Sequence, residues 1–547
     1  MPDRELSLKA RLPAALAPRI EQMLASASEQ RVADRLEEAD ATLWGPPGTP
    51  EIANRLGWLR ISEQMLDELV QIEAFTDGVR RDGLADVVLL GMGGSSLAPE
   101  VFQLDFGSAP GFPRLHVLDS TDAATIGAVQ ASVDPARTLF IVSSKSGGTI
   151  EPLSLFAHFY SLREDGANFA AITDPGSGLA RLASERGFRH VFYGDPDIGG
   201  RYSALSPFGI VPATLAGIDA AALLGRAPEA RRATVDADDA QGMPAGVWLG
   251  AVLAALARAG RDKLTFAIAP SLPGLGLWLE QLFAESTGKH GTGILPVADE
   301  PLGDPAEYGE DRVFAHLPDP HAPDAANEQR LAALAAAGHP VITIPTTGPA
   351  DLGRVFLLSE LAVAVAGWGL QINPFDQPNV QQAKDATNRV LAGYEKGGEL
   401  PQVATASEQD LRELLLGAAP PHYVALMAYL QPSAAFDAAA ADLRQAIRAA
   451  TRATTTFGYG PRFLHSTGQF HKGGPKVGRF LQLLHNGPND VEIPGQPYTF
   501  TTLKEAQAIG DIQTLRELGL PAQRVRLEGD DPADALSALT ATIREWT

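Results

Sequence analysis

The stretch FIVSSKSGGT, residues 140–149, joins an apolar run to a cluster of serines, glycines, a lysine and a threonine. The apolar half has the pattern of a short buried strand, and the next residues, TIEPLSLFAHFYSLRE, have the pattern of a helix. A strand-to-helix turn offers free N–H groups and the positive end of the helix dipole to an anion. Ser144, Lys145, Ser146 and Thr149 add hydroxyl groups and a charge, which suits a phosphate monoester. A polar turn capped by serine and threonine would give the same residues, and the Walker spacing is absent.

Similar apolar runs alternate with helical patterns along the chain. Before residue 200, short buried strands are predicted at 86–92, 115–120, 138–144, 169–174 and 190–195. A second series is predicted at 264–270, 292–298, 312–318 and 340–346. Strands separated by helices indicate a parallel sheet with helices on both faces. The predicted fold class is therefore α/β, with two units.

The two ends of the chain have other patterns. The first ~50 residues are charged and helical in pattern, and we expect them to pack on the outside. Beyond residue 400 the sequence predicts helices, a loop-rich stretch at 456–500 and a last strand-like run, QRVRLEG. The predicted domains are an N-terminal helical segment at 1–50, α/β units at 51–240 and 241–400, and a C-terminal helical and loop region at 401–547.

Composition narrows the class of protein. The chain has 547 residues, of which 45% are hydrophobic and 20% charged, as in globular proteins with a sizeable core. Its net charge of −22 argues against broad nucleic-acid binding. It has no cysteine, which excludes disulfides and thiol catalysis. No apolar run approaches the ~20 residues of a membrane span, and the start lacks the apolar core of a secretory signal. We expect a cytoplasmic protein with no membrane or nucleic-acid partner.

Two glycine-rich turns are further candidates for a ligand site. GMGGSS, residues 91–96, lacks the third glycine of a dinucleotide fingerprint, so its glycines indicate a close approach of ligand or backbone. Ser95 in this turn could contact a sugar phosphate or cap a helix. GGRYSALSPFG places Arg201 after a glycine pair, where it could bind an oxyanion or form a structural ion pair.

The helical stretch GLGLWLEQLFAESTGKHGTG has an apolar stripe and a glycine, Gly288, placed to end it. Glu285 falls in the last turn, where the helix dipole opposes a carboxylate by roughly 0.3–1 kcal/mol. That field would raise the pKa of the carboxyl and suit a general base. An exposed glutamate balanced by Lys289 is the simpler interpretation of the same residues.

Two more segments carry candidate proton-transfer groups. In NPFDQPNVQQAKDATNRVL, Lys384 falls near the inner side of a predicted helix, although its stem could also lead the ammonium to water. In GYGPRFLHSTGQFHKGGP, His465 and His471 lie in a glycine-rich loop and could shuttle protons. No spacing typical of a metal site is present. His316 and His321 are expected at the surface, in a proline-rich turn.

These motifs together resemble the glucose-6-phosphate isomerase (phosphoglucose isomerase) family. The matching stretches are GMGGSSLAPE, SSKSGGTIEP, GGRYSALSPFG, AESTGKHGTGILPV and NPFDQPNVQQAK, in that order. The resemblance runs from about residue 40 to the end, and the chain is similar in particular to the isomerase part of bacterial transaldolase–isomerase proteins. It implies two sugar-isomerase (SIS) domains, each an α/β/α sandwich with a parallel sheet, with helical extensions at both termini. It implies no cofactor and no metal.

The resemblance also implies roles for single residues. Ser144, Lys145, Ser146 and Thr149 match the phosphate loop of the family, Ser95 its first glycine loop, and Gln377 a glutamine on the substrate side. Glu285 matches the base that moves a proton between C1 and C2. Arg201 matches the arginine that stabilises the enediolate, and Lys384 the lysine that acts with a histidine in ring opening.

The position of the histidine departs from the family pattern. In most members the histidine motif lies between the base and the lysine, but here the similar stretch, LHSTGQFHKGG, follows Lys384. The resemblance favours His465, with His471 and His316 as the other candidates. In the family this histidine usually comes from the second subunit, which implies a homodimer with a shared active site. A phosphosugar-binding protein without catalysis, and an isomerase that also accepts mannose 6-phosphate, remain alternatives.

Overall fold

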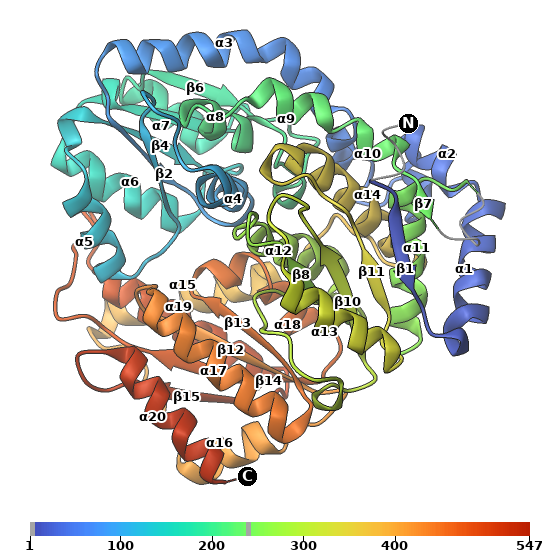
Figure 1. Ribbon diagram of the computed structural model, residues 1–547. Helices are drawn as coiled ribbons and strands as arrows, with labels where there is room; N and C mark the ends of the chain where they lie inside the picture. Colours follow the sequence, from blue (N-terminus) through green and yellow to red (C-terminus); the bar gives the residue numbers. More distant parts are fainter. Residues whose placement is uncertain (1–5, 237–241, 547) are drawn as a thin grey trace.

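The computed structural model describes residues 6–236 and 242–546, and its strands form three sheets (Figure 1). The first sheet lies at the upper left of the view, the second at the right and the third at the bottom. Helix α12 (Leu275–Thr287) lies near the centre, between the three. The predicted α/β class with parallel sheets is confirmed.

The first sheet has the order β3-β2-β4-β5-β6, and all its strand pairs are parallel. Its strands are β2 (Asp86–Leu90), β3 (Arg114–Leu118), β4 (Thr138–Ser143), β5 (Phe169–Thr173) and β6 (His190–Tyr193). Strand β3 lies on one side of β2 and strand β4 on the other, so the chain changes direction between β2 and β4. Ligands of open parallel sheets bind beyond the strand ends at such a point. The loops after β2 and β4, which are the glycine and serine loops of the sequence, therefore lie side by side.

Helices lie before, between and after these strands in the chain. They are α3 (Ile61–Arg81), α4 (Leu97–Phe106), α5 (Ala123–Ser132), α6 (Ile150–Leu162), α7 (Gly178–Glu185), α8 (Pro207–Leu215), α9 (Ala220–Arg226) and α10 (Glu229–Arg232). Every residue of β2, β4 and β5 is buried, as expected for strands covered on both faces.

The second sheet has the order β7-β1-β11-β10-β8-β9. Its predicted strands are β8 (Lys263–Ile268), β9 (Leu295–Val297), β10 (Arg312–Leu317) and β11 (Val341–Thr343), with helices α11 (Ala245–Arg258), α13 (Ala325–Ala336) and α14 (Leu352–Leu370). The N-terminal segment was predicted to be helical but is only partly so. Before α1 (Ala17–Glu29) and α2 (Val32–Glu37) comes strand β1 (Leu8–Arg11), which pairs antiparallel with β11 and parallel with β7 (Val235–Asp236). Pairing and the full burial of Leu8 hold this segment in the sheet.

The C-terminal region contains a third parallel sheet, of which only the last strand was predicted, as the strand-like run QRVRLEG. Its strands are β12 (Tyr423–Tyr429), β13 (Thr454–Tyr459), β14 (Gly478–Leu484) and β15 (Ala522–Arg526), in the order β13-β12-β14-β15. The accompanying helices are α15 (Val380–Gly397), α16 (Glu408–Leu416), α17 (Ala434–Thr451), α18 (Gly468–Gly473), α19 (Phe500–Glu517) and α20 (Pro532–Glu545). The description of 401–547 as helices and loops is therefore wrong. Every residue of β12 is buried, and this supplies the core of the region. The four domain boundaries remain a prediction.

Buried arginines join the second and third units. Glu300 is fully buried and is paired with Arg312 of β10 and Arg448 of α17. Arg312 also donates to Thr454 of β13 (3.0 Å), and Arg444 of α17 donates to the carbonyl of Ala298 (3.0 Å). A buried charge must be paired or hydrogen-bonded to be tolerated. This cluster therefore fixes how the C-terminal unit sits on the rest of the chain.

Helix α14 is the apolar core of the second unit. Among the described residues, 349–370 are the one helical stretch long and apolar enough to cross a membrane, which the sequence analysis did not expect. The whole tested window is buried inside the protein, where α14 packs against α11 and α12. Its apolar character is therefore explained by its place in the core.

Candidate functional site

The serine loop follows β4 directly and leads into α6. Ser144 is buried and its hydroxyl donates to Thr149 Oγ1 (3.2 Å), whereas Ser146 is exposed. Gly147 has φ of +66°, a conformation that glycine adopts freely. Lys145 is held away from the loop hydroxyls, because its Nζ is 2.5 Å from Asp174 Oδ2. The structure thus brings three predicted phosphate ligands to one turn and gives the fourth a carboxylate partner.

The glycine loop after β2 is packed between two other segments. A Cβ on Gly94 would lie 2.2 Å from the carbonyl oxygen of Gly200, the residue before Arg201. A Cβ on Gly93 would lie 2.9 Å from Cβ of His465. Glycine is required at these contacts, because a side chain would displace backbone. Ser95 is buried in the same turn, so the loop brings predicted residues from three parts of the chain together.

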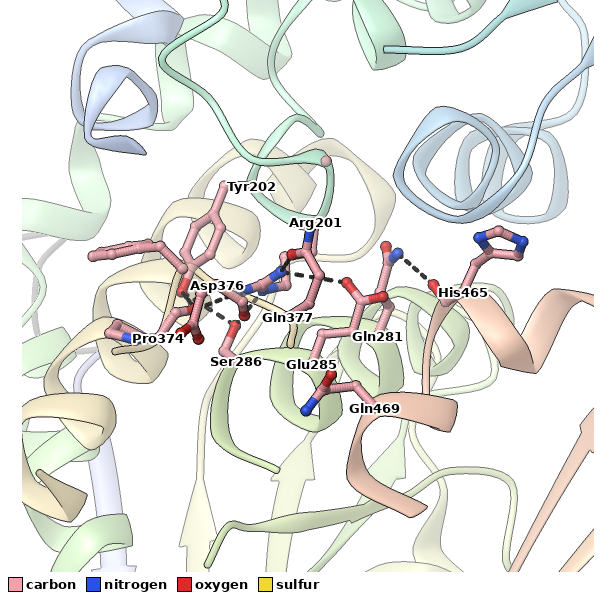
Figure 2. A network of polar contacts seen from close by, with 12 residues as sticks. Arg201, Tyr202, Gln281, Glu285, Ser286, Pro374, Asp376, Gln377, His465 and Gln469 are labelled. Carbon is pink, nitrogen blue, oxygen red and sulfur yellow. Dashed lines mark hydrogen bonds and ion pairs between the residues drawn. The ribbon is translucent and has the colours of Figure 1, made fainter. Parts of the chain in front are cut away.

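Arg201 is the centre of the polar network in Figure 2. Its guanidinium is almost fully buried and lies 3.5 Å from Glu285 Oε2. It donates to Gln377 Oε1 (2.6 Å) and to Ser286 Oγ (2.8 Å), and its remaining nitrogen donates to the carbonyls of Pro374 (2.7 Å) and Asp376 (3.0 Å). These partners fix the orientation of the planar guanidinium, so that one of its edges faces Glu285.

Glu285 is buried at the end of α12, so its interpretation as an exposed glutamate balanced by Lys289 is wrong. Burial raises the pKa of Glu285, and the nearby Arg201, His465 and Lys289 oppose this rise. A carboxyl in a water-poor site with an elevated pKa is suited to general-base catalysis near neutral pH.

Lys289 takes a different partner from the one the sequence suggested. It is fully buried, and its Nζ donates to Asp376 Oδ1 (2.7 Å) and to the carbonyls of Asp376 (2.6 Å) and Asn373 (2.8 Å). Burial and the Arg201 charge lower the pKa of Lys289 to about 7, although Asp376 opposes the shift. Lys289 and Arg201 thus hold the segment 373–377, which presents Gln377, from two sides.

His465 lies beside this network in the same chain. Its backbone carbonyl accepts from Gln281 Nε2 (2.7 Å), one turn before Glu285 (Figure 2). Its Nε2 donates to Glu151 Oε1 (3.0 Å), since an ionised carboxylate can only accept. Burial alone would raise the pKa of Glu151, but the His465 contact and the charge of Lys384 lower it. The histidine therefore has its Nε2 fixed by a carboxylate and keeps Nδ1 for another partner.

A residue of the C-terminal unit holds the carboxylate of Glu151 in place. Gln507 of α19 donates to Glu151 Oε1 (2.7 Å), and the hydroxyl of Thr121 donates to the side-chain oxygen of Gln507 (2.7 Å). Glu151 was not singled out in the sequence, although it follows Thr149 by two residues in the motif SSKSGGTIEP. Gln281 was also missed. Gln281 could have been recognised as a site residue from its position one turn before Glu285 on the apolar helix.

Lys384 lies at the rim of the pocket that holds His465. Thr149, Glu151, Lys384 and His465 line one pocket, with Val380 and Leu464 among its apolar walls. Lys384 is exposed, so its expected place near the inner side of the helix is wrong. It is nevertheless close enough to Glu151 to lower the pKa of that carboxyl.

The other candidate histidines lie elsewhere. His471 is buried in the C-terminal unit with its Nδ1 3.0 Å from the hydroxyl of Tyr423. His316 lies in β10 and not in a proline-rich turn, and it lines a surface groove with Lys9 and Arg11 of β1. His321 is exposed. Within 6–236 and 242–546, no cluster of three or more histidine or acidic side chains is arranged to hold a metal ion.

Comparison with known proteins identifies the family. The model of the family described as phosphoglucose isomerase matches residues 60–294. A protein of Thermosynechococcus vestitus named glucose-6-phosphate isomerase is 30% identical over 465 residues, or 74% of this chain and 86% of that protein. The chain belongs to the phosphoglucose isomerase family. A family member from Rubrobacter xylanophilus is 29% identical over 412 residues, or 65% of this chain and 92% of that protein.

Solved structures agree with this phosphoglucose isomerase assignment at the level of the fold. A hypothetical protein of Thermus thermophilus superposes with a TM-score of 0.57 and 26% identity, covering 70% of this chain and 100% of its own. A glucose-6-phosphate isomerase of Chlamydia trachomatis has a TM-score of 0.52 at 18% identity, covering 69% and 86%. The family match at 60–294 includes Ser95, the serine loop, Arg201 and Glu285 but not Lys384 or His465.

Proposed function

We propose that this chain is a glucose-6-phosphate isomerase, which interconverts glucose 6-phosphate and fructose 6-phosphate. One observation carries the proposal. Glu285 and Arg201 lie 84 residues apart in the chain and 3.5 Å apart in space, beside the glycine loop, with His465 packed on that same loop. A base, an oxyanion partner and a histidine at the switch point of a parallel sheet are what an aldose–ketose isomerisation needs.

The serine loop is proposed to hold the phosphate group. Ser144, Ser146 and Thr149 supply hydroxyl donors, and the N-terminus of α6 supplies N–H groups. Fixing this end of the sugar lowers the entropic part of the barrier, because the reacting carbons are then brought to the base. Ser95, in the neighbouring glycine loop, is proposed to contact the sugar, and Lys145 acts through its charge.

Glu285 is proposed to be the base. In the direction from glucose 6-phosphate, its carboxylate removes the proton from C2, and the electron pair of that C–H bond moves through C1 to O1. The resulting cis-enediolate carries negative charge on oxygen, and the guanidinium of Arg201, held by Gln377 and by backbone carbonyls, stabilises that charge. The proton of O2 then passes to O1, and Glu285 returns its proton to C1 as the carbonyl forms at C2.

His465 and Lys384 are proposed to transfer protons in ring opening. The Glu151 carboxylate accepts from Nε2 of His465 and orients the ring, so that Nδ1 can exchange a proton with the ring oxygen of the sugar. Lys384 reaches the same pocket from α15. No other group is required for the steps described, and the proposal includes no metal or cofactor.

A coupled assay tests the proposal. Fructose 6-phosphate is supplied with glucose-6-phosphate dehydrogenase, with and without a chelator, and the expected result is turnover that the chelator does not change. Glu285→Gln should lower kcat by about 10²- to 10⁴-fold with little change in KM. Glu280→Gln is the matched control, because Glu280 is a buried glutamate on the same helix that accepts from Ala298 N (3.2 Å). Near-normal turnover of Glu285→Gln would refute the assignment of the base.

The alternatives give other results. A phosphosugar-binding protein without catalysis would bind fructose 6-phosphate and show no turnover in any variant. An isomerase of broader specificity would also convert mannose 6-phosphate in the same assay. A cytoplasmic location, a homodimer and a relation to transaldolase fusions stay predictions. A partner is not needed to supply His465, since one chain carries it beside Glu285.

A further inference from the structure

Helix α18 connects the histidine loop to the ends of the helices that carry Glu285 and Lys384. Its residue Gln469 is completely buried. Nε2 of Gln469 donates to the carbonyl of Gly288 (2.9 Å), the residue directly after α12. The same Nε2 donates to Asn379 Oδ1 (2.9 Å), and Oε1 accepts from Asn379 N (2.9 Å), at the N-cap of α15. One side chain thus bonds to three groups on two separate segments.

Glycines allow helix α18 to lie closely against the end of α12. A Cβ on Gly473 would lie 2.4 Å from Asn379 Oδ1 and 2.7 Å from the carbonyl oxygen of Gly288. A Cβ on Gly288 would lie 2.5 Å from Cα of Phe470. The N–H of Gly291 also donates to the carbonyl of Gly473 (2.9 Å). Helix α18 therefore lies in direct backbone contact with the end of α12, and glycines make that contact possible.

We propose that Gln469 is a positioning residue for the isomerase reaction. It fixes the end of α12, which carries Glu285, and the start of α15, which follows Gln377, relative to the loop of His465. This inference rests on the proposed function. Figure 2 shows Gln469 and His465 on the same segment, with Gln469 below Glu285 and His465 to its right. A displacement of about 1 Å in a catalytic group can cost about 10²-fold in rate, so loss of these bonds should be visible in turnover.

Replacing Gln469 by leucine tests the proposal, because leucine fills similar space and removes all three bonds. The expected result is a kcat about 10- to 100-fold lower, with KM for fructose 6-phosphate and the inhibition constant of inorganic phosphate nearly unchanged. Phosphate binding is spared because the serine loop has no bond to Gln469. A merely structural role would lower the melting temperature without this split between kcat and KM.

Gln482→Leu is the matched control. Gln482 is also fully buried in the C-terminal unit, where it donates to the carbonyl of Ala508 (2.9 Å) and accepts from Arg524 (2.7 Å). Its loss should reduce the melting temperature and leave kcat close to that of the unmodified chain. Equal kcat for Gln469→Leu and the unmodified chain, or equal loss in both variants, would overturn the positioning role.

A second variant covers the case in which Gln469→Leu does not fold. Asn379→Ala removes the side-chain acceptor and keeps the backbone bond to Gln469 Oε1, and it should lower kcat several-fold with KM unchanged. If Gln469→Leu is unfolded and Asn379→Ala has full turnover, the positioning role is wrong. The two proposals remain distinguishable. An inactive unmodified chain contradicts the isomerase function, whereas an active chain with insensitive variants contradicts only the role of Gln469.

Discussion

His465 and His471 lie six residues apart in one glycine-rich segment, and the fold gives them opposite environments. His465 is partly exposed in a pocket and bonded to Glu151 at 3.0 Å. His471 is buried between Tyr423 and Phe480, and burial together with Lys472 lowers its pKa to about 3. The residue type is the same, so the difference comes from the docking of α18, which begins between them. Position relative to a packed helix decides which histidine can transfer protons.

Replacing each histidine in turn gives the largest expected contrast. His465→Asn should lower kcat by about 10²- to 10⁴-fold, as for loss of a general acid–base group. His471→Phe should keep kcat and lower the melting temperature, because the Tyr423 hydroxyl loses its partner at a cost of about 1–3 kcal/mol. The coupled assay and thermal unfolding measure both. Similar kinetic losses in the two variants would remove the distinction.

The carboxylate beside His465 gives the next largest effect. Glu151→Gln should lower kcat about 10- to 100-fold, because Nε2 of His465 loses the charged acceptor that orients the ring. The effect acts through the histidine, so the double variant with His465→Asn should be no worse than His465→Asn alone. Steady-state kinetics of the four proteins complete this cycle. Additive losses would show that Glu151 acts independently of His465.

The loss of folding stability at acid pH should depend on the buried histidine, His471. The pKa of His471 is about 3 in the folded chain, below its ordinary value of 6.5, so between these values the unfolded chain binds more protons. The contribution of His471 to folding stability is therefore present above pH ~6.5 and is lost as pH falls toward ~3. Melting temperatures at about pH 5 and about pH 7 should differ less in His471→Phe than in the unmodified chain. An unchanged difference would contradict the buried, neutral state of His471.

Lys384 and Lys289 also have opposite environments, and a smaller effect on kcat is expected from this difference. Lys384 is exposed, whereas the pKa of buried Lys289 is lowered to about 7. The charged form of Lys289 donates to the segment 373–377, so kcat should decline as pH rises through about 7 and this hold weakens. Lys289→Arg remains protonated and should move that decline to higher pH. A pH–rate profile with the same alkaline limb in both proteins would assign the limb to another group.

Strands β2 to β6 and β8 to β11 could be predicted from sequence because each is a short, mostly apolar run between helical patterns. Strand β12, YVALMAY, has the same character but was overlooked. Strand β1 was not predictable, because its four residues are held by pairing with β11, distant in sequence. A local apolar pattern therefore indicates most strands, whereas a strand such as β1 depends on pairing with a segment distant in sequence.

The site was predicted to the extent that its residues occur in motifs. Arg201, Glu285, Gln377 and His465 come together, while Lys145 turns to Asp174 and Lys384 faces water. The burial of Glu285 and the partners of Lys289 depend on how α12 meets the segment 373–377 and helix α18. Those contacts join residues far apart in the chain, so no local pattern could reveal them.

In this structure one chain supplies both Glu285 and His465 to a single site, and co-expression of two inactive variants shows whether it does so in solution. Glu285→Gln and His465→Asn would be produced together with different tags, and the turnover of the mixed material measured with fructose 6-phosphate. The mixed material should have no more activity than the two variants show when they are produced separately. Recovery of substantial activity would mean that intact sites form between subunits, and would contradict a site built within one chain.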